Sequence, residues 1–254
     1  MVIDSHAHLE MAPFDRDRDQ VVKRAKDAGV EVIVTVGTTV VDCRKALEIT
    51  RRYPGVYAVI GIHPHEVKDI KGETYDTLKE MAKHEKVVAY GEIGLDFFRN
   101  LSPRGTQIHR FGEQLELASE LGLPVVIHDR DAHRETMNLL KGWNGSRRGI
   151  IHCFSGDYPM ARQCIDLGFC ISIPGTVTFE KNENLRSIVR ELPLESLLVE
   201  TDCPYLTPNP FRGKRNEPAY VIHTTRKIAE IKGKTFEEVA AVTTGNAKAL
   251  FNIP

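Results

Sequence analysis

The sequence predicts a closed (β/α)₈ TIM barrel, an α/β fold in which helices surround eight parallel strands. Three observations predict it. The 254 residues contain 41% hydrophobic side chains, enough to form one sizeable core. Short apolar runs recur eight times along the chain, and segments with helical periodicity separate them. Apolar strands that alternate with helices are typical of a parallel sheet covered on both faces, and eight such units are the number in a barrel.

The predicted strands are short runs rich in apolar and β-branched residues. The first is V-I-D-S, the second is E-V-I-V-T-V and the fifth is P-V-V-I-H. Short continuous apolar runs of this kind are expected for strands that are buried on both faces. The eight strands are expected at residues 2–5, 31–36, 56–61, 86–91, 124–128, 149–152, 169–173 and 196–200.

Apolar residues spaced by three or four positions predict helices between the strands. Three such segments, at residues 21–28, 108–118 and 160–165, have a glycine shortly after them, and glycine commonly ends a helix. Towards the far end of the chain, Thr235 and Glu238 form a capping box that predicts the start of another helix. No linker, long repeat or low-complexity tract divides the chain, so we expect a single domain over residues 1–254.

The first strand argues against the main alternative fold, an open doubly wound sheet. Such a sheet normally has a glycine-rich phosphate-binding turn after its first strand. This chain has H-A-H-L-E at that place, starting at His6. The sequence therefore favours the barrel, and the paired histidines need another explanation.

Composition and charge exclude several classes of protein. The formal net charge is -1 and the pI is near 6.8, which excludes a protein that coats nucleic acid non-specifically. Asp4 and Glu10 lie where a signal peptide would have basic and then apolar residues, and no apolar run is long enough to span a membrane. The five cysteines form no C-x-x-C pair. We expect a cytoplasmic protein with reduced thiols and no membrane helix.

Side chains that commonly bind metals stand at the carboxyl ends of the predicted strands. In a barrel these ends meet in one pocket. A single histidine after a strand is more often a core or surface residue, but burying a whole set of such groups unpaired would be costly. We therefore expect them to form one functional site. The residues are His6, His8, His63, Glu92, His128, His152, Glu200 and Asp202.

The types of ligand predict two divalent ions. His6 and His8 are two positions apart, so in an extended chain both side chains point the same way and can bind one ion. Imidazoles and carboxylates without thiolates suit Zn²⁺, Mn²⁺, Co²⁺ or Mg²⁺. The set exceeds the three protein ligands of a typical catalytic zinc, so two ions fit better than one. Glu92 is the expected bridge between them, because its strand lies between the histidines of the first, fifth and sixth strands and one oxygen could face each ion.

Seven motifs that include these residues resemble a known family. They are D-S-H-A-H-L, G-I-H-P-H, G-E-I-G-L-D, P-V-V-I-H-D-R-D-A, I-H-C-F-S-G, E-T-D-C-P-Y-L-T-P and R-N-E-P. In this order they resemble the TatD family of metal-dependent deoxyribonucleases, a branch of the amidohydrolase-like TIM barrels. The resemblance extends from about residue 2 to N-A-K-A-L-F near the end.

The resemblance implies a role for each candidate ligand. One ion would be held by His6, His8, Glu92 and Asp202, and the other by Glu92, His128 and His152. His63 would lie near the scissile phosphate. Glu200 would be an outer carboxylate or a further metal contact.

The activity that the resemblance implies is hydrolysis of DNA phosphodiesters by a metal-activated water. The enzyme would act as an exonuclease on single strands or strand ends. Asp202 would take or steer the proton of the water, and His63 would balance charge on the phosphoryl oxygens. Basic and aromatic residues after the strands are candidates for contact with DNA. These candidates are Arg130, Tyr205, Arg212, Lys214, Arg215, Phe97 and Phe98, and the acidic Glu200 is a further candidate for contact with substrate. Members of the family often carry a tyrosine where this chain has Phe97 and Phe98.

Two other functions are compatible with the same residues. A dinuclear hydrolase on this barrel can cleave a small ester, lactone or amide instead of DNA, and the fold alone does not separate these substrates. A non-catalytic scaffold could keep the ions as structural struts. The full ligand set argues against the scaffold, which has no need of an open coordination position.

Overall fold

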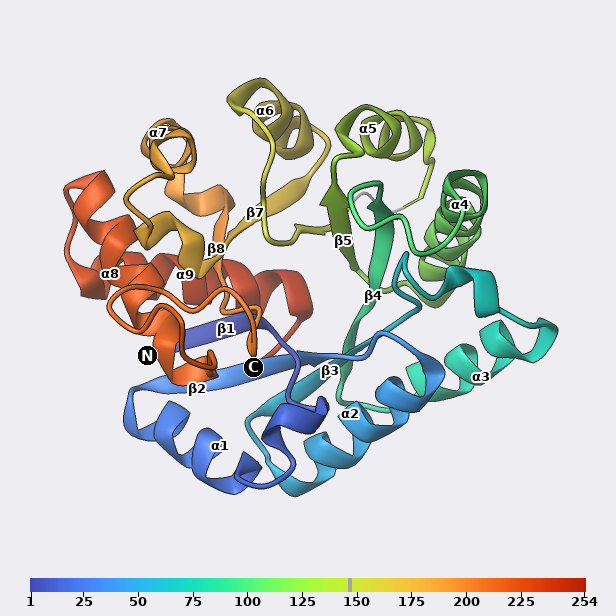
Figure 1. Ribbon diagram of the computed structural model, residues 1–254, viewed down its shortest axis with the longest axis horizontal. Coiled ribbons are helices and arrows are strands. Elements are labelled where there is room, and N and C mark those ends of the chain that lie inside the picture. The colour runs from blue at the N-terminus through green and yellow to red at the C-terminus, as the bar shows by residue number, and fades with distance from the viewer. Residues whose placement is uncertain (146–147) are drawn as a thin grey trace.

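The computed structural model describes residues 1–145 and 148–254, and within them eight parallel strands pair in the order of the sequence (Figure 1). A parallel bridge between Ala7 and Cys203 connects the first strand to the segment after the last. The predicted barrel is therefore confirmed. The strands are β1 (Val2–Ala7), β2 (Val30–Val36), β3 (Val56–Ile60), β4 (Val87–Asp96), β5 (Val125–Arg130), β6 (Gly149–Ile151), β7 (Phe169–Ile173) and β8 (Leu197–Val199).

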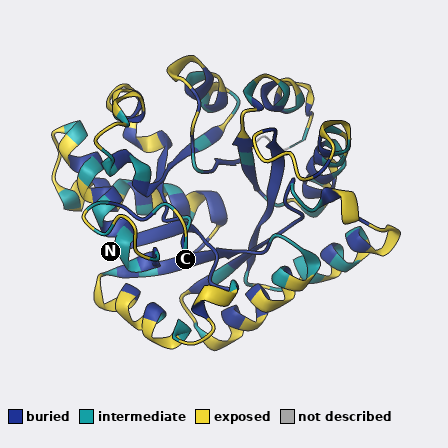
Figure 2. Ribbon diagram, viewed as in Figure 1, coloured by how far each residue is buried: buried dark blue, intermediate teal, exposed yellow. Residues whose placement is uncertain are grey.

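Helices surround the strands, and Figure 2 shows that the strands are buried while the outer sides of the helices are exposed. The helices are α1 (Arg18–Asp27), α2 (Val40–Arg52), α3 (Gly72–Ala82), α4 (Arg104–Leu121), α5 (His133–Gly142), α6 (Tyr158–Asp166), α7 (Glu183–Glu191), α8 (Val221–Lys232) and α9 (Phe236–Phe251). Short 3₁₀ helices lie at Ala12–Phe14, Val67–Asp69, Gly175–Thr178, Leu194–Ser196 and Pro218–Tyr220. Across the described part of the chain, every helix is too short or too polar to cross a membrane.

The predicted helix signals occur where the sequence indicated. Gly122 adopts a left-handed conformation, with φ of 66°, and ends α4. Thr235 and Glu238 form the capping box at the start of α9: the Thr235 hydroxyl accepts from the Glu238 backbone N–H, and the Glu238 carboxylate accepts from the Thr235 N–H. Both helix boundaries thus follow from local chemistry.

One strand differs clearly from its prediction. The sequence indicated that the fourth strand ends at Gly91, whereas β4 continues to Asp96 and is buried along its whole length. Glycine usually weakens a strand, but here Gly94 pairs with His128 and Asp96 pairs with Arg130 of β5. Gly94 has φ of 140°, and a Cβ atom there would lie 2.0 Å from the carbonyl oxygen of His128. The close approach of the two strands therefore requires glycine at this position.

Candidate metal centre

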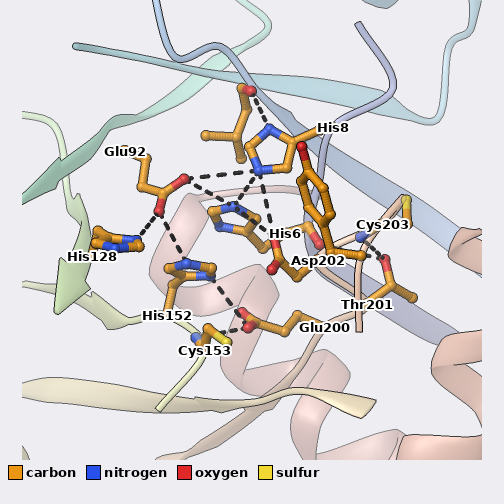
Figure 3. A network of polar contacts seen from close by, with 12 residues as sticks. His6, His8, Glu92, His128, His152, Cys153, Glu200, Thr201, Asp202 and Cys203 are labelled. Carbon is orange, nitrogen blue, oxygen red and sulfur yellow. Dashed lines mark hydrogen bonds and ion pairs between the residues drawn. The ribbon is translucent and has the colours of Figure 1, made fainter. Parts of the chain in front are cut away.

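The predicted ligands come together at the carboxyl ends of the strands (Figure 3). His6 lies in β1, Glu92 in β4 and His128 in β5, while the others directly follow a strand or lie a few residues beyond it. Three groups of these side chains have ligand atoms within 4.8 Å of one another and could hold a metal ion. The groups are His6, His152 and Asp202; His6, His8 and Glu92; and His63, Glu92 and His128.

Glu92 lies at the centre, and its two carboxylate oxygens face different sets of imidazoles. Oε2 is 3.4 Å from Nε2 of His6 and 3.8 Å from Nε2 of His8. Oε1 is 2.6 Å from Nδ1 of His128 and 3.0 Å from Nε2 of His152. A carboxylate that faces two sets of nitrogen ligands in this way has the geometry that a bridge between two ions needs.

The electrostatics keep Glu92 ionised. Burial alone would raise the pKa of Glu92, but the surrounding imidazoles, His152 first among them, lower it well below its usual range. A buried anion among imidazoles is ready to bind a cation without first losing a proton.

Asp202 adds a second carboxylate on the side of His6 and His8. Its Oδ1 lies 3.8 Å from Nε2 of His6 and 3.5 Å from Nε2 of His8. The two imidazole nitrogens are themselves 3.2 Å apart, and within the described residues Nδ1 of His6 is buried without a hydrogen-bond partner. Nitrogen and oxygen donors that converge in this way suit a divalent cation of the zinc, manganese or cobalt type.

His63 differs from the other imidazoles because a backbone group determines which nitrogen carries its proton. Nδ1 of His63 accepts a hydrogen bond from the backbone N–H of His65 at 3.1 Å, so this nitrogen carries no proton. Burial lowers the pKa of His63 to about 4, which keeps the ring neutral with its proton on Nε2. Nε2 lies 3.5 Å from Oε1 of Glu92. His63 therefore presents a hydrogen-bond donor to the centre, although it belongs to one of the three groups above.

Several residues that orient the ligands were missed by the sequence analysis. Nδ1 of His8 lies 2.9 Å from the carbonyl oxygen of Val36 and 3.1 Å from Oε1 of Glu10, and Thr35 donates to Glu10 at 2.8 Å. Glu10 follows His8 by two positions, and this spacing was a signal that could have identified it. Partners of this kind fix the orientation of metal-binding histidines.

Asp96 is another missed residue, and it contacts two histidines at once. Its Oδ2 lies 3.2 Å from Nε2 of His128 and 2.9 Å from Nε2 of His65. Asp96 is the last residue of the motif G-E-I-G-L-D, but it lies beyond Gly91, where the fourth strand was predicted to end, so it had no predicted place in the site. Its position depends on the extension of β4.

The comparison with known proteins identifies the family. The family model described as TatD related DNase matches residues 3–252. The chain belongs to the TatD-related DNase family. Over its full length it is 45% identical to the uncharacterized metal-dependent hydrolase YabD of Bacillus subtilis (strain 168), and it covers 100% of that protein. It is 39% identical to the 3′-5′ ssDNA/RNA exonuclease TatD of Erwinia billingiae (strain Eb661), again with 100% of each chain covered.

A solved structure supports the same assignment. The crystal structure of YJJV, a TatD homologue from Escherichia coli K12, superimposes with a TM-score of 0.95 at 33% sequence identity. The match covers 100% of this chain and 98% of the other. The barrel and the order of its strands are therefore those of the TatD-related DNases.

Two of the candidate substrate contacts in this TatD-related DNase are buried. Glu200 has no exposed surface: its Oε1 lies 3.3 Å from Nδ1 of His152 and accepts the backbone N–H of Cys153 at 2.7 Å. Glu200 therefore contacts His152 and offers no exposed atom to a substrate. Phe97 is only 8% exposed and packs in the core, so it offers no stacking surface.

Other candidates remain at the surface around the mouth of the barrel. Phe98 is 58% exposed, and the guanidinium of Arg130 lies 4.1 Å from the centre of its ring. Tyr205 is 53% exposed, and its hydroxyl lies 3.6 Å from the sulfur of Met11. Phe98 follows β4 and Tyr205 follows β8, and Arg130 is the last residue of β5.

The basic loop at residues 212–215 divides into two kinds of residue. Arg212 and Lys214 are exposed, and Arg212 lies over the ring of Phe179 at 4.4 Å. Arg215 instead makes a two-pronged ion pair with Asp17, at 2.8 and 2.6 Å. Because this pair neutralises its charge and holds the loop against the segment before α1, Arg215 is a weaker candidate for binding phosphate than the sequence indicated.

Proposed function

We propose that this chain is a divalent-metal-dependent phosphodiesterase that removes nucleotides from the ends of single-stranded DNA, and that residues 1–254 act as one hydrolase domain. The observation that carries the proposal is the position of Glu92, whose two oxygens face two sets of imidazoles. The relative named 3′-5′ ssDNA/RNA exonuclease supports the class of substrate. All five cysteines are free, which supports a reducing compartment such as the cytoplasm.

The proposal assigns two divalent ions, of Zn²⁺, Mg²⁺, Mn²⁺ or Co²⁺. Ligands for the first would be His6, His8, Glu92 and Asp202, and ligands for the second would be Glu92, His128 and His152. When bound, such a pair would supply an activated water at neutral pH and positive charge beside the phosphoryl oxygens. The mixed imidazole and carboxylate donors favour this class of ion over a soft one such as Cu(I).

The protein's own groups would have three roles. His63 would donate a hydrogen bond from Nε2 to a phosphoryl oxygen, since its Nδ1 already accepts from the backbone. Asp202, whose side chain is 14% exposed, is the most open of the carboxylates and would accept a proton from the attacking water. Glu92, with a side chain only 3% exposed, would stay ionised and hold the ligands of both sets in place.

The substrate would approach across the exposed rim. Arg130 and Lys214 would contact phosphates, and Phe98 and Tyr205 would stack on bases, because sequence-independent binding of single strands combines positive charge with aromatic surfaces. Their exposure and their place after the ligand-bearing strands support this part of the proposal.

The decisive experiment compares wild type with Glu92→Gln on single-stranded DNA labelled at the 3′ or the 5′ end. We expect wild type to shorten the strand from one end, EDTA to stop the reaction, and Glu92→Gln to lower the rate at least about 100-fold. Glu113→Gln is the matched control, because Glu113 lies on α4 and pairs with Tyr75 and Arg110 outside the centre.

Three results would contradict the proposal. If Glu92→Gln were as active as wild type, Glu92 could not be the bridge between two ions. Hydrolysis of a lactone, ester or amide by a wild type that leaves DNA intact would favour the small-molecule hydrolase. Bound ions without turnover on any of these substrates would favour the scaffold.

A further inference from the structure

Asp96, at the end of β4, occupies a place between two loops that reach the centre. Only 1% of its surface is exposed, and it accepts hydrogen bonds from groups on both sides. Oδ1 accepts the backbone N–H of Arg99 at 2.7 Å, and Oδ2 faces the Nε2 atoms of His65 and His128. We propose that Asp96 is a positioning residue that determines which ring nitrogen of His128 binds metal and, through His65, holds His63 as a donor.

The two ring nitrogens of His128 face two different carboxylates. Nε2 lies 3.2 Å from Oδ2 of Asp96, and Nδ1 lies 2.6 Å from Oε1 of Glu92. A carboxylate that already accepts two other donors offers a lone pair, so Nε2 of His128 must carry the proton. Nδ1, which faces the ionised carboxylate of Glu92, is then the nitrogen that can give up its proton to bind an ion. Metal-binding histidines are commonly oriented by a carboxylate on the far nitrogen in this way.

Asp96 also contacts the segment after β3, which contains His63 and His65. His65 donates from Nε2 to the same oxygen of Asp96 at 2.9 Å, and its carbonyl oxygen accepts from the hydroxyl of Ser102 at 2.8 Å. These contacts fix the backbone N–H of His65, which donates to Nδ1 of His63 at 3.1 Å. Asp96 thereby supports a metal ligand on β5 and a hydrogen-bond donor after β3.

Asp96 itself is held rigidly by the fully buried Gln107 of α4. Oε1 of Gln107 accepts the backbone N–H of Asp96 at 2.8 Å, and its Nε2 donates to the backbone carbonyl of Asp96 at 3.2 Å. Because both its backbone N–H and its carbonyl are hydrogen-bonded, Asp96 can hold its carboxylate in one orientation. This rigidity is what a positioning residue requires.

The inference predicts separate effects on metal binding and on turnover. In Asp96→Asn, the amide oxygen can still accept from the backbone N–H of Arg99, and the amide nitrogen then faces both histidines as a donor. Nε2 of His128 must then accept a hydrogen bond, which moves its proton to Nδ1, the nitrogen that faces the metal centre. We expect titration calorimetry with Zn²⁺ to show one of two ions bound about 10- to 100-fold more weakly. Asp129→Asn is the matched control: Asp129 is also buried and bonded to a histidine, His133, but outside the centre. Unchanged affinity for both ions in Asp96→Asn would overturn the inference.

His65→Ala tests the effect of Asp96 on His63 separately from its effect on His128. It leaves the contact of Asp96 with His128 in place, so we expect Zn²⁺ affinity to stay as in wild type while kcat falls. Loss of Zn²⁺ in His65→Ala, or an unchanged kcat, would contradict the role of His65.

A measurement on the unaltered protein keeps the inference testable if Asp96→Asn does not fold. Long-range ¹H–¹⁵N NMR of the Zn²⁺-loaded wild type should show the proton of His128 on Nε2 and that of His63 on Nε2. A proton on Nδ1 of His128 would overturn the inference. Its consequence for catalysis rests on the proposed function, but the two fail separately: a wild type with this tautomer that leaves DNA intact refutes only the proposed function.

Discussion

Asp4 of β1 accepts two hydrogen bonds from Thr201, one from its backbone N–H at 2.9 Å and one from its hydroxyl at 2.6 Å. Both residues are almost completely buried, and they are separated by nearly the whole chain. Thr201 directly precedes Asp202, so this contact holds the carboxylate of Asp202 beside His6 and His8. It also connects the first strand to the segment after the last.

Asp4→Ala should destabilise the protein and weaken metal binding. The variant leaves the buried backbone N–H of Thr201 without its acceptor and its hydroxyl with only the carbonyl oxygen of His6, at 3.5 Å; loss of a buried partner costs about 1–3 kcal/mol. We expect a lower free energy of unfolding in urea and a weaker Zn²⁺ affinity. Asp4→Asn is the control, since its amide can accept from the N–H and donate to the hydroxyl. Equal stability of Asp4→Ala and wild type would show that the contact contributes nothing.

His63→Ala should lower turnover without removing metal. Its Nδ1 accepts from the backbone, so the ring acts as a donor, and loss of one donor to the phosphoryl group typically lowers kcat about 100- to 1,000-fold. We expect elemental analysis to find the same metal content as in wild type. His152→Ala, by contrast, should lose metal. Depletion of metal in His63→Ala would show that His63 is a ligand.

Phe98→Ala should weaken binding of single-stranded DNA but leave a small phosphodiester unaffected. The exposed ring offers a stacking surface, which is worth about 1–3 kcal/mol for each base. KM should rise for an oligonucleotide and stay constant for a nitrophenyl phosphodiester. Leu101→Ala, at a 53% exposed apolar residue of the same loop, is the control. A similar rise in KM for both variants would argue against stacking.

Lys214 and Arg215 should respond differently to substitution. Lys214 is exposed, so Lys214→Ala should reduce the slope of log affinity against log salt by about 1. Arg215 pairs with Asp17, so Arg215→Ala should mainly lower the stability, by about 1 kcal/mol for a partly exposed pair. Binding titrations at several salt concentrations and thermal melting measure the two effects. A larger change of slope in Arg215→Ala than in Lys214→Ala would reverse this assignment.

Gly94→Ala should prevent β4 and β5 from pairing at the centre. The added Cβ would lie 2.0 Å from the carbonyl oxygen of His128, and φ of 140° is unfavourable for alanine. We expect poor folding or a large fall in melting temperature. Gly112→Ala, inside α4 with no atom near its Cβ, should instead raise stability by about 1 kcal/mol. A Gly94→Ala variant that melts like wild type would exclude the close approach.

The strands were predictable from the sequence because a strand buried on both faces must be apolar at nearly every position. Seven of the eight predicted runs begin and end within two residues of the observed strands, whereas the fourth stops five residues early. The extension of β4 beyond Gly91 was missed because glycine is locally unfavourable in a strand, while pairing with β5 favours it.

By itself, the sequence determined the barrel and the set of His, Glu and Asp side chains that the barrel gathers at one end. The physical reason is local. Apolar runs define each strand, and a polar residue at the carboxyl end of any strand lies at the same end of the barrel as those of the other strands. Only the tertiary structure decided which atoms meet. Asp96 touches His65 and His128, and Arg215 is bound to Asp17, because the chain brings together groups that are far apart in sequence. Hydrogen bonding depends on positions to within a few tenths of an ångström, which no spacing along the chain specifies.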